Sequence, residues 1–383
     1  MSKSEAKVTP YAGLKACCRH ITSRESSSDK IQFVVGTSVI GKPNQIQIIE
    51  YDDIQETIQC IQALDHPDEI WWVACHPTEI DLMMTISAKD SARVSSTRLY
   101  RIPQQDSLSA FGSPEKQPLE LISTFETDDK FAQRVCYLSN KSKCLISCAK
   151  TLNVFDVQRP GSPICLIDAV QQFQSANNTK IKSNNANDDQ SHNDGLEYEI
   201  SASAADPLHS DVVACCIENT ATLWDLRSGN VAHHIEDNQD NVILDIAFNE
   251  NKPWWVCTGG SDGMLRCWDV RVGKPRCEFR ASSHWLTRTI PSSSHEQLIL
   301  TAGSDAKVRV INSREFAFQN DGKLPDGEII KSIRHDDTVC AATWASNPWV
   351  FASVSYKGQV NVCQLPSTVV DAILMGDDDD FSD

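Results

Sequence analysis

The sequence contains no long run of apolar residues. No stretch approaches the roughly eighteen apolar residues of a membrane-spanning helix, and the first residues, MSKSEAKVTP, lack the apolar core of a signal peptide. Positive charge is also scarce, because 35 Lys and Arg stand against 52 Asp and Glu and leave a net charge of -17. This balance argues against binding to nucleic acid and against adsorption to anionic lipid. We expect a cytoplasmic protein with no direct membrane insertion.

The motifs of common enzyme classes are absent as well. GxSxG, GxxxxGK[ST], GxGxxG and HExxH do not occur, so we expect neither an enzyme nor a cofactor. None of the 15 cysteines forms a CxxC, and Cys144 and Cys148 make a single CxxxC without paired His, so no metal site is predicted. In a reducing compartment such free cysteines behave as small buried side chains.

The stretch Asn241–Arg271 carries the clearest pattern in the chain. Its apolar residues alternate with period two, which predicts half-buried strands over Val242–Phe248, Trp254–Thr258 and Met264–Trp268. The breaks between these runs are rich in Gly, Asn, Ser and Pro, which favour turns. The sequence therefore predicts three short antiparallel strands in succession.

The last of these turns and the pair that follows it have a familiar form. Asp262-Gly263 suits a tight turn, because glycine accepts positive φ and Asp can hydrogen-bond to its own backbone. With Trp268-Asp269 at the end of the third run, the stretch resembles a WD40 repeat. One such unit cannot bury both of its faces, so further copies are expected along the chain.

Seven positions end a comparable apolar run. They are Ile49-Glu50, Tyr100-Arg101, Phe155-Asp156, Trp224-Asp225, Trp268-Asp269, Ile311-Asn312 and Cys363-Gln364. Successive endings lie 43 to 69 residues apart, close to a WD40 unit of about 40–45 residues with a loop. The chain is therefore predicted to be all-β, a single seven-bladed WD40 β-propeller over residues 11–370, with blades ending near residues 49, 100, 155, 224, 268, 311 and 363.

Three segments are expected outside the regular repeat. Residues 1–10 are predicted as an N-terminal tail, the Asn- and Ser-rich residues 175–195 as a disordered insertion, and residues 371–383 as an acidic C-terminal tail. The seventh ending is followed by a poor strand. We therefore expect the N-terminal run Leu14–Thr22 to supply the missing strand and to close the ring, which removes an open sheet edge.

Some residues are expected to support the blades rather than bind a ligand. Many WD40 blades pair a His before the first strand with an Asp in the turn between the second and third strands. His66 and His335 occupy such His positions, and Asp262 and Asp305 such turn positions, but Lys357 replaces the Asp of the seventh blade. The expected structural positions are Asp262, Asp305, His66, His335, Trp224, Asp225, Trp268 and Asp269.

Aromatic residues are the first candidates for partner binding. Trp71 and Trp72 are adjacent in a predicted strand, so their side chains must face opposite sides. In one interpretation, one ring packs in the core between blades and the other lies on a partly covered surface. In the other, they bind a partner protein, since Trp is enriched at the hot spots of protein interfaces. Trp285 lies at a strand start and is a third candidate.

Two short boxes offer an alternative function. WDLR (Trp224–Arg227) and WDVR (Trp268–Arg271) resemble the box through which substrate receptors of cullin-4 ubiquitin ligases contact their adaptor. The competing interpretation is that Arg227 and Arg271 pair with nearby carboxylates on an exposed outer strand. Both interpretations stay open from the sequence.

Longer stretches resemble one WD40 family, the EARP and GARP complex-interacting proteins. They are Ile31–Asp53, His66–Pro77, Ser283–Val308 and Asn347–Pro366, in colinear order. The resemblance implies a non-enzymatic adaptor that associates with these tethering complexes in endosomal recycling, endosome-to-Golgi retrograde transport and dense-core vesicle cargo sorting. It implies a monomeric propeller within a larger complex, held on endosomes and the trans-Golgi network by its partners.

Overall fold

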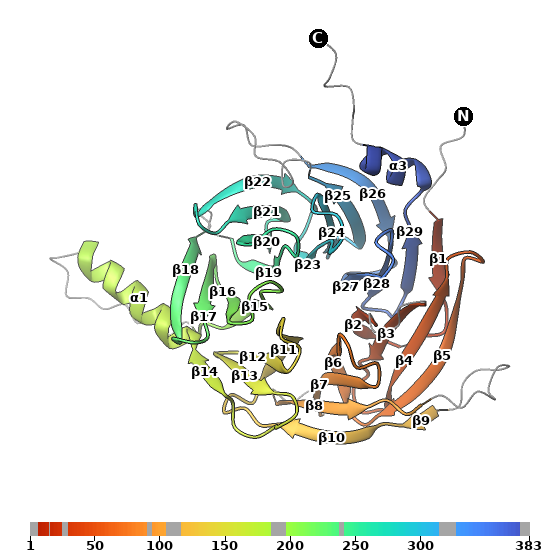
Figure 1. The fold of residues 1–383 in the computed structure, drawn as a ribbon, viewed down its shortest axis with the longest axis horizontal. Coiled ribbons are helices and arrows are strands. Elements are labelled where there is room, and N and C mark those ends of the chain that lie inside the picture. Colours follow the sequence, from red (N-terminus) through yellow and green to blue (C-terminus); the bar gives the residue numbers. More distant parts are fainter. Residues whose placement is uncertain are drawn as a thin grey trace, which may run out of the picture.

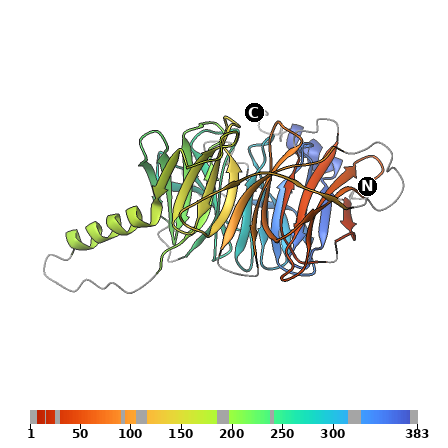
Figure 2. The ribbon, with the colours of Figure 1, turned by 90° about the horizontal axis from the view of Figure 1, so that it is seen from below.

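The strands form a ring of seven sheets around a central channel (Figure 1). The structure is a computed structural model that describes residues 7–14, 16–24, 30–89, 94–104, 116–184, 197–236, 241–313 and 327–375. Seen from the side, the ring is a disc from which one helix projects (Figure 2). The prediction of a seven-bladed β-propeller is confirmed.

Each blade is an antiparallel sheet whose strands follow one another from the channel outward. Blade 1 contains β2 (Cys18–Ser23), β3 (Ile31–Thr37), β4 (Asn44–Asp52) and β5 (Thr57–His66), with β9 (Lys116–Pro118) added in parallel to β5. Blade 2 contains β6 (Glu69–Cys75), β7 (Leu82–Ala88), β8 (Ser95–Arg101) and β10 (Glu120–Phe125). Blade 3 contains β11 (Ala132–Tyr137), β12 (Lys143–Cys148), β13 (Thr151–Asp156) and β14 (Cys165–Asp168).

The next three blades repeat this order. Blade 4 contains β15 (Ile200–Ala205), β16 (Val212–Ile217), β17 (Thr220–Asp225) and β18 (Asn230–Glu236). Blade 5 contains β19 (Ile243–Phe248), β20 (Trp255–Gly260), β21 (Met264–Asp269) and β22 (Lys274–Arg280). Blade 6 contains β23 (Leu286–Pro291), β24 (Leu298–Gly303), β25 (Lys307–Asn312) and β26 (Glu328–Arg334).

Blade 7 joins the two ends of the chain. It contains β27 (Val339–Trp344), β28 (Val350–Ser355) and β29 (Val360–Gln364), and its outer strand is β1 (Lys7–Tyr11). An N-terminal strand thus closes the ring, but the expected segment was wrong. Leu14–Thr22 runs instead into β2, the first strand of blade 1, and residues 7–10 of the predicted tail pair with β29. The period-two pattern marks a strand but does not specify which sheet edge it joins.

Two segments predicted to be irregular are helical in their described parts. Helix α1 (Ala169–Asn184) takes the first half of the predicted 175–195 insertion, and residues 185–195 lie outside the described part of the chain. Asp168 Oδ1 accepts a hydrogen bond from Gln171 N at 2.8 Å at the start of α1, as an N-cap does. Helix α3 (Ser367–Met375) takes the start of the predicted acidic tail, whose residues 376–383 also lie outside the described part.

The hydrophobic core is divided among the contacts between blades. Seven clusters of buried side chains occur, one at each junction of neighbouring blades around the ring. The inner strands are covered on both faces, and all seven residues of β7 are buried, whereas residues of the outer strand β18 alternate between exposed and covered. All fifteen cysteines are free and buried or half-buried, and all but Cys17 lie in strands.

The disc has two faces. The blade-joining face carries the loops from one blade to the next, such as residues 67–68, 281–285 and 335–338. The opposite face carries the loops between first and second strands, such as residues 76–81, 138–142 and 206–211. Each first strand has a bulge at its second residue, or at its third in β6, close to the blade-joining face. The residues that follow these bulges in blades 1 to 7 are His20, Trp72, Arg134, Ala202, Asp245, Arg288 and Ala341.

Candidate functional site

The two Trp-Asp pairs lie at the ends of the third strands of blades 4 and 5. Trp224 and Trp268 are buried, and both indole nitrogens donate to the neighbouring second strand. Trp268 Nε1 donates to Thr258 Oγ1 at 2.8 Å, whereas Trp224 Nε1 donates to the sulfur of Cys215 at 3.3 Å. Because sulfur is a weak acceptor, the bond in blade 4 is the weaker of the two.

The turn aspartates of blades 5 and 6 are paired with arginine. Asp262 Oδ1 accepts from Met264 N at 3.0 Å, and Gly263 adopts a φ of 77°, as the predicted tight turn requires. Asp262 Oδ2 lies 2.7 Å from Arg266 Nη2, and Asp305 Oδ2 lies 2.6 Å from Arg309 Nη2. An arginine four residues after the turn Asp therefore replaces the histidine of the usual pair.

The two expected histidines contact hydroxyl groups on second strands. His335 Nε2 lies 2.9 Å from Ser353 Oγ in blade 7, and His66 Nε2 lies 3.3 Å from Thr85 Oγ1 in blade 2. Burial lowers the pKa of both imidazoles to about 4. Both histidines are therefore neutral at pH 7. His66, in β5, links blade 1 to blade 2, and His335 links the loop between blades 6 and 7 to the second strand of blade 7.

The arginines of the WDxR boxes lie exposed, each paired with the aspartate of its own box. Arg227 forms two bonds to Asp225, at 3.1 and 3.0 Å, and Arg271 forms two to Asp269, both at 3.0 Å. The Arg227 and Arg271 side chains remain 74% and 55% exposed. The hydrogen bonds from Arg227 lower the pKa of Asp225. Local pairing and exposure thus coexist at equivalent places on neighbouring blades.

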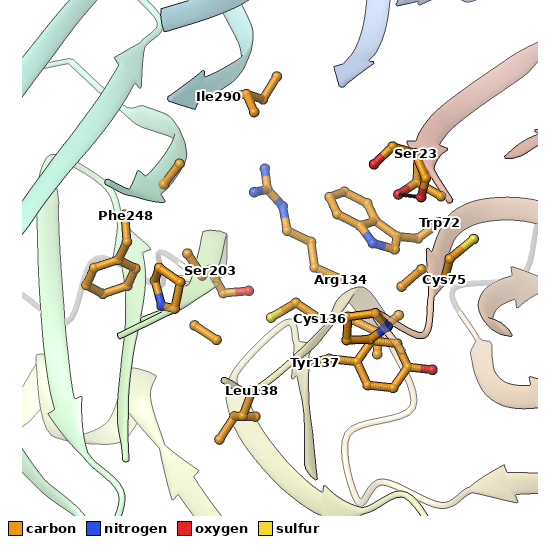
Figure 3. Close-up of a pocket in the computed structure, with 18 of the residues that line it drawn as sticks. Ser23, Trp72, Cys75, Arg134, Cys136, Tyr137, Leu138, Ser203, Phe248 and Ile290 are labelled. Carbon is orange, nitrogen blue, oxygen red and sulfur yellow. Dashed lines mark hydrogen bonds between the residues drawn. The ribbon is translucent and has the colours of Figure 1, made fainter. Parts of the chain in front are cut away.

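The three tryptophans proposed for partner binding occupy two environments. Trp71 is the bulge residue of β6, where its ring meets Phe131 edge-on at 5.6 Å and Arg19 at 5.3 Å. Trp285 is 61% exposed in the loop before β23, so both residues belong to the blade-joining face. Trp72 points into the central channel instead (Figure 3).

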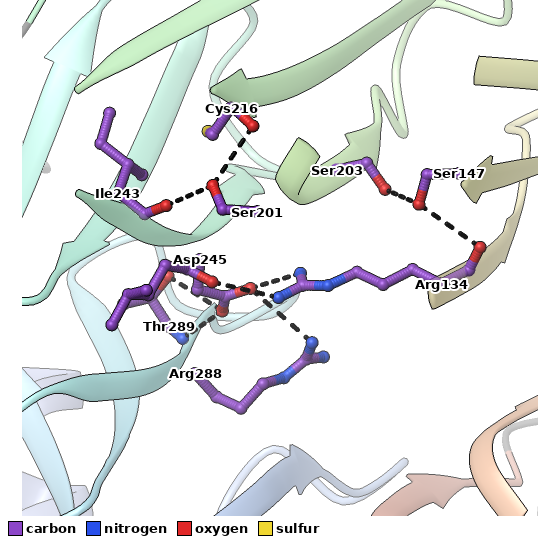
Figure 4. A network of polar contacts seen from close by, with 10 residues as sticks. Arg134, Ser147, Ser201, Ser203, Cys216, Ile243, Asp245, Arg288 and Thr289 are labelled. Atoms are coloured by element: carbon purple, nitrogen blue, oxygen red, sulfur yellow. Dashed lines mark hydrogen bonds and ion pairs between the residues drawn. The ribbon is translucent and has the colours of Figure 1, made fainter. Parts of the chain in front are cut away.

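A polar and aromatic cluster, which we call the channel cluster, fills the channel beside Trp72. Its members are His20, Trp72, Arg134, Asp245 and Arg288, all residues that follow a bulge. Arg134 extends across the channel to Asp245, where Nη1 lies 2.5 Å from Oδ1, and Arg288 Nη1 lies 3.7 Å from the same oxygen (Figure 4). Thr289 N also donates to Asp245 Oδ2 at 2.6 Å.

Rings and cations contact each other closely in this cluster. His20 stacks on Trp72 with ring centroids 3.9 Å apart, and the guanidinium carbons of Arg288 and Arg134 lie 4.6 and 5.2 Å from the Trp72 ring. Burial lowers the pKa of Arg288 to about 10, and burial with the two arginines lowers the pKa of His20 well below its usual value. The cluster therefore carries two arginine cations, one carboxylate and a neutral imidazole.

A cavity of about 610 Å³ extends from the channel cluster toward the opposite face. Its walls combine apolar side chains, including Leu138, Phe248 and Ile290, with backbone of the first strands (Figure 3). Of its members only Trp72 was a candidate from the sequence, because the five residues lie up to 268 positions apart and come from five blades. The only signal was a charged or aromatic residue at the same position of several first strands.

The described residues carry few other signs of ligand chemistry. Among them, no three His, Cys, Asp or Glu side chains are grouped so that they could hold a metal ion. Neither helix in the described part of the chain is long and apolar enough to span a membrane. Among the described residues, the channel cluster, the blade-joining face and the exposed arginines of the WDxR boxes are candidate binding surfaces.

Comparisons with known proteins agree with the resemblance found in the sequence. Residues 166–311 match the model of the family described as EIPR1 beta-propeller. The EARP and GARP complex-interacting protein 1 of Rattus norvegicus is 26% identical over 95% of this chain and 98% of its own length, as is that of Homo sapiens. The EARP-interacting protein 1 of Caenorhabditis elegans is 26% identical over 91% of this chain and 94% of its own. The chain is thus a seven-bladed β-propeller that resembles the EARP and GARP complex-interacting proteins over nearly its whole length.

Proposed function

We propose that this protein is a non-enzymatic scaffold that binds the EARP and GARP tethering complexes. The observation that carries the proposal is the similarity over 95% of the chain to relatives named for interaction with these complexes. By the same resemblance, it acts in endosomal recycling, endosome-to-Golgi retrograde transport and dense-core vesicle cargo sorting. It works as a monomeric propeller in the cytoplasm, and its partners hold it on endosomes and the trans-Golgi network.

The rigidity of the ring supports a scaffold role. Seven inter-blade cores hold the loops of each face at preset positions, so little conformational entropy is lost when a partner binds. The blade-joining face is the proposed contact surface. It exposes Trp285 and Tyr356 and carries the Arg19–Trp71 pair, and both aromatic residues and arginine are enriched at binding hot spots.

The test is affinity purification of the tagged full-length chain from cells, followed by mass spectrometry. Tethering-complex subunits should be recovered with the wild type and lost or strongly reduced with Trp285→Ala. This variant should keep the wild-type thermal midpoint, because the side chain is 61% exposed. The matched control is Val272→Ala on the opposite rim, also an exposed apolar side chain, which should retain the subunits. Failure of the wild type to recover any tethering subunit would refute the proposal.

The second candidate is a substrate receptor of a cullin-4 ubiquitin ligase. The observation in its favour is the exposure of Arg227 and Arg271 at equivalent positions of adjacent blades. Charge reversal of both arginines to Glu should abolish recovery of the ligase adaptor and leave tethering subunits in place if this function holds. Recovery of tethering subunits alone by the wild type would leave the first proposal standing and remove the second.

A further inference from the structure

The channel cluster contains more hydrogen-bond donors than acceptors. His20 Nδ1 accepts from Val73 N at 3.4 Å, which places the proton of the neutral ring on Nε2. His20 Nε2 and Arg288 Nε are both buried, and neither has a hydrogen-bond partner among the described residues. Burying a donor without an acceptor costs about 1–3 kcal/mol, so two such donors around the one Trp72 ring are unusual in a native structure.

The charge of the cluster is also unbalanced. Arg134 and Arg288 are 13% and 16% exposed and share the single carboxylate of Asp245, which is 2% exposed. With His20 neutral, this leaves one unmatched positive charge beside the cavity. At the far end of the cavity, Lys141 and Glu250 are of opposite sign and cancel formally. The charged side chains around the cavity therefore sum to one net positive charge, which a ligand with one negative charge would balance.

The walls of the cavity indicate what carries that charge. Six strands line the cavity, namely β2, β6, β11, β15, β19 and β23. Each is the innermost strand of its sheet, so one of its backbone edges faces the channel. Leu138, Phe248 and Ile290 add apolar surface between these edges. Backbone edges together with apolar pockets suit an extended peptide better than a small inorganic anion.

From these observations we propose that the channel binds a peptide that enters from the opposite face and places one acidic side chain against Arg288, Arg134 and His20. The two carboxylate oxygens accept the unpaired donors of Arg288 and His20, and the apolar walls hold the flanking residues. This site is separate from the blade-joining face and does not depend on binding to the tethering complexes.

The test uses the full-length protein and two synthetic peptide mixtures. They are acetyl-X-X-Glu-X-X-amide and acetyl-X-X-Gln-X-X-amide, where X is an equimolar mixture of Ala, Leu, Val and Phe. In fluorescence anisotropy with a labelled Glu mixture, the Glu peptides should bind about tenfold or more tightly than the Gln peptides, as a charge-assisted bidentate contact predicts. Inorganic phosphate and acetate should displace them only weakly.

The variants locate the binding. Arg288→Gln should weaken binding of the Glu mixture by about tenfold or more, and Arg288→Lys, which keeps the charge but loses Nε–H, by less. The control is Arg227→Gln, which removes the same charge on the outer rim and should leave binding unchanged. Because Arg288→Gln could unfold the chain, wild-type protein with ¹⁵N-labelled arginine provides a second measurement, in which the Arg288 Nε–H signal should shift on peptide addition.

Several outcomes would overturn the proposal. They are absence of binding to the wild type, equal binding of the Glu and Gln mixtures, retention of binding by a folded Arg288→Gln variant, and an unchanged Arg288 Nε–H signal. Tighter binding of inorganic phosphate than of the Glu mixture would also refute it, since the channel would then be a phosphate site.

Discussion

Arg266 reaches back from β21 to the carboxylate of Asp262 in the turn before it, at 2.7 Å, with its side chain only 1% exposed. Arg309 and Asp305 repeat the arrangement in blade 6. In both blades the arginine pairs with the turn aspartate, as a histidine of the preceding loop was expected to do. Each turn is therefore held by an arginine of its own hairpin in addition to the loop from the previous blade, from which Asn241 Nδ2 donates to Asp262 and Ser283 N donates to Asp305, both at 3.3 Å.

Removing that partner should destabilise blade 5. Arg266→Met leaves a largely buried carboxylate without its cation, so the free energy of unfolding should fall by about 3 kcal/mol. Urea unfolding followed by tryptophan fluorescence measures the change. Adding Asp262→Asn should recover part of the loss, because the unpaired charge is then gone. If the single and double variants lose the same unfolding free energy, the loss comes from the packing of Arg266 and not from the unpaired charge.

Blades 4 and 5 offer a matched comparison of two indoles. Trp268→Phe leaves the buried hydroxyl of Thr258 without its indole donor, whereas Trp224→Phe removes a donor only from the sulfur of Cys215. We expect Trp268→Phe to cost about 1 kcal/mol more than Trp224→Phe in chemical unfolding, since the lost bond has a stronger acceptor. Trp268→Phe combined with Thr258→Val should close the difference. A larger cost for Trp224→Phe would contradict this ranking.

The buried histidines should make the fold sensitive to acid. His66 and His335 have pKa values of about 4 in the folded protein because burial disfavours the charged ring, against about 6.5 in the unfolded chain. The unfolded state therefore takes up protons first as pH falls. Their stabilisation is complete above pH 6.5 and is lost progressively as pH falls toward 4.

This loss can be measured by difference. The free energy of unfolding of the wild type should drop between pH 7 and pH 4.5, and it should drop less in His335→Gln, which has no imidazole to protonate at that site. Carboxylates titrate in both proteins, so the gap between the two curves reports His335 alone. Parallel curves would mean that His335 does not contribute to the acid response.

The closing strand gives a prediction about association. Deleting residues 1–12 removes β1 and uncovers the edge of β29 in blade 7. We expect a lower thermal midpoint and concentration-dependent self-association, because an unpaired strand edge can pair with another chain. Light scattering together with a thermal melt checks both effects. Deleting residues 1–5, which leaves β1 whole, is the control and should change neither property.

The sequence predicts the repeat well and the long-range contacts poorly. The strands of blade 5 follow the alternation of Val242–Phe248 and the Asp262-Gly263 turn closely, because period and turn chemistry are local properties. The pairing of Lys7–Tyr11 could not be predicted from such local patterns, since its partner strand β29 lies about 350 residues away in the sequence. Helix α1 was missed because its polar composition resembles that of a loop.

The channel cluster was beyond prediction for a further reason. Each of its members is ordinary within its own strand, and Arg134 reads as a polar residue on a half-buried strand. Its contact with Asp245 depends on the curvature of the whole ring, which brings first strands of distant blades within reach across the channel. The bulge that the first strands share, and that precedes each member of the cluster, became visible only once the strand register was known.

The pairing of β1 with β29 also has a consequence for how the protein is made. β1 cannot pair until β29, about 350 residues further along the chain, has been synthesised. The ring therefore closes only after all seven blades have been made. A chain that stops before β29 would keep β1 as an unpaired strand, which is a site for association with other chains.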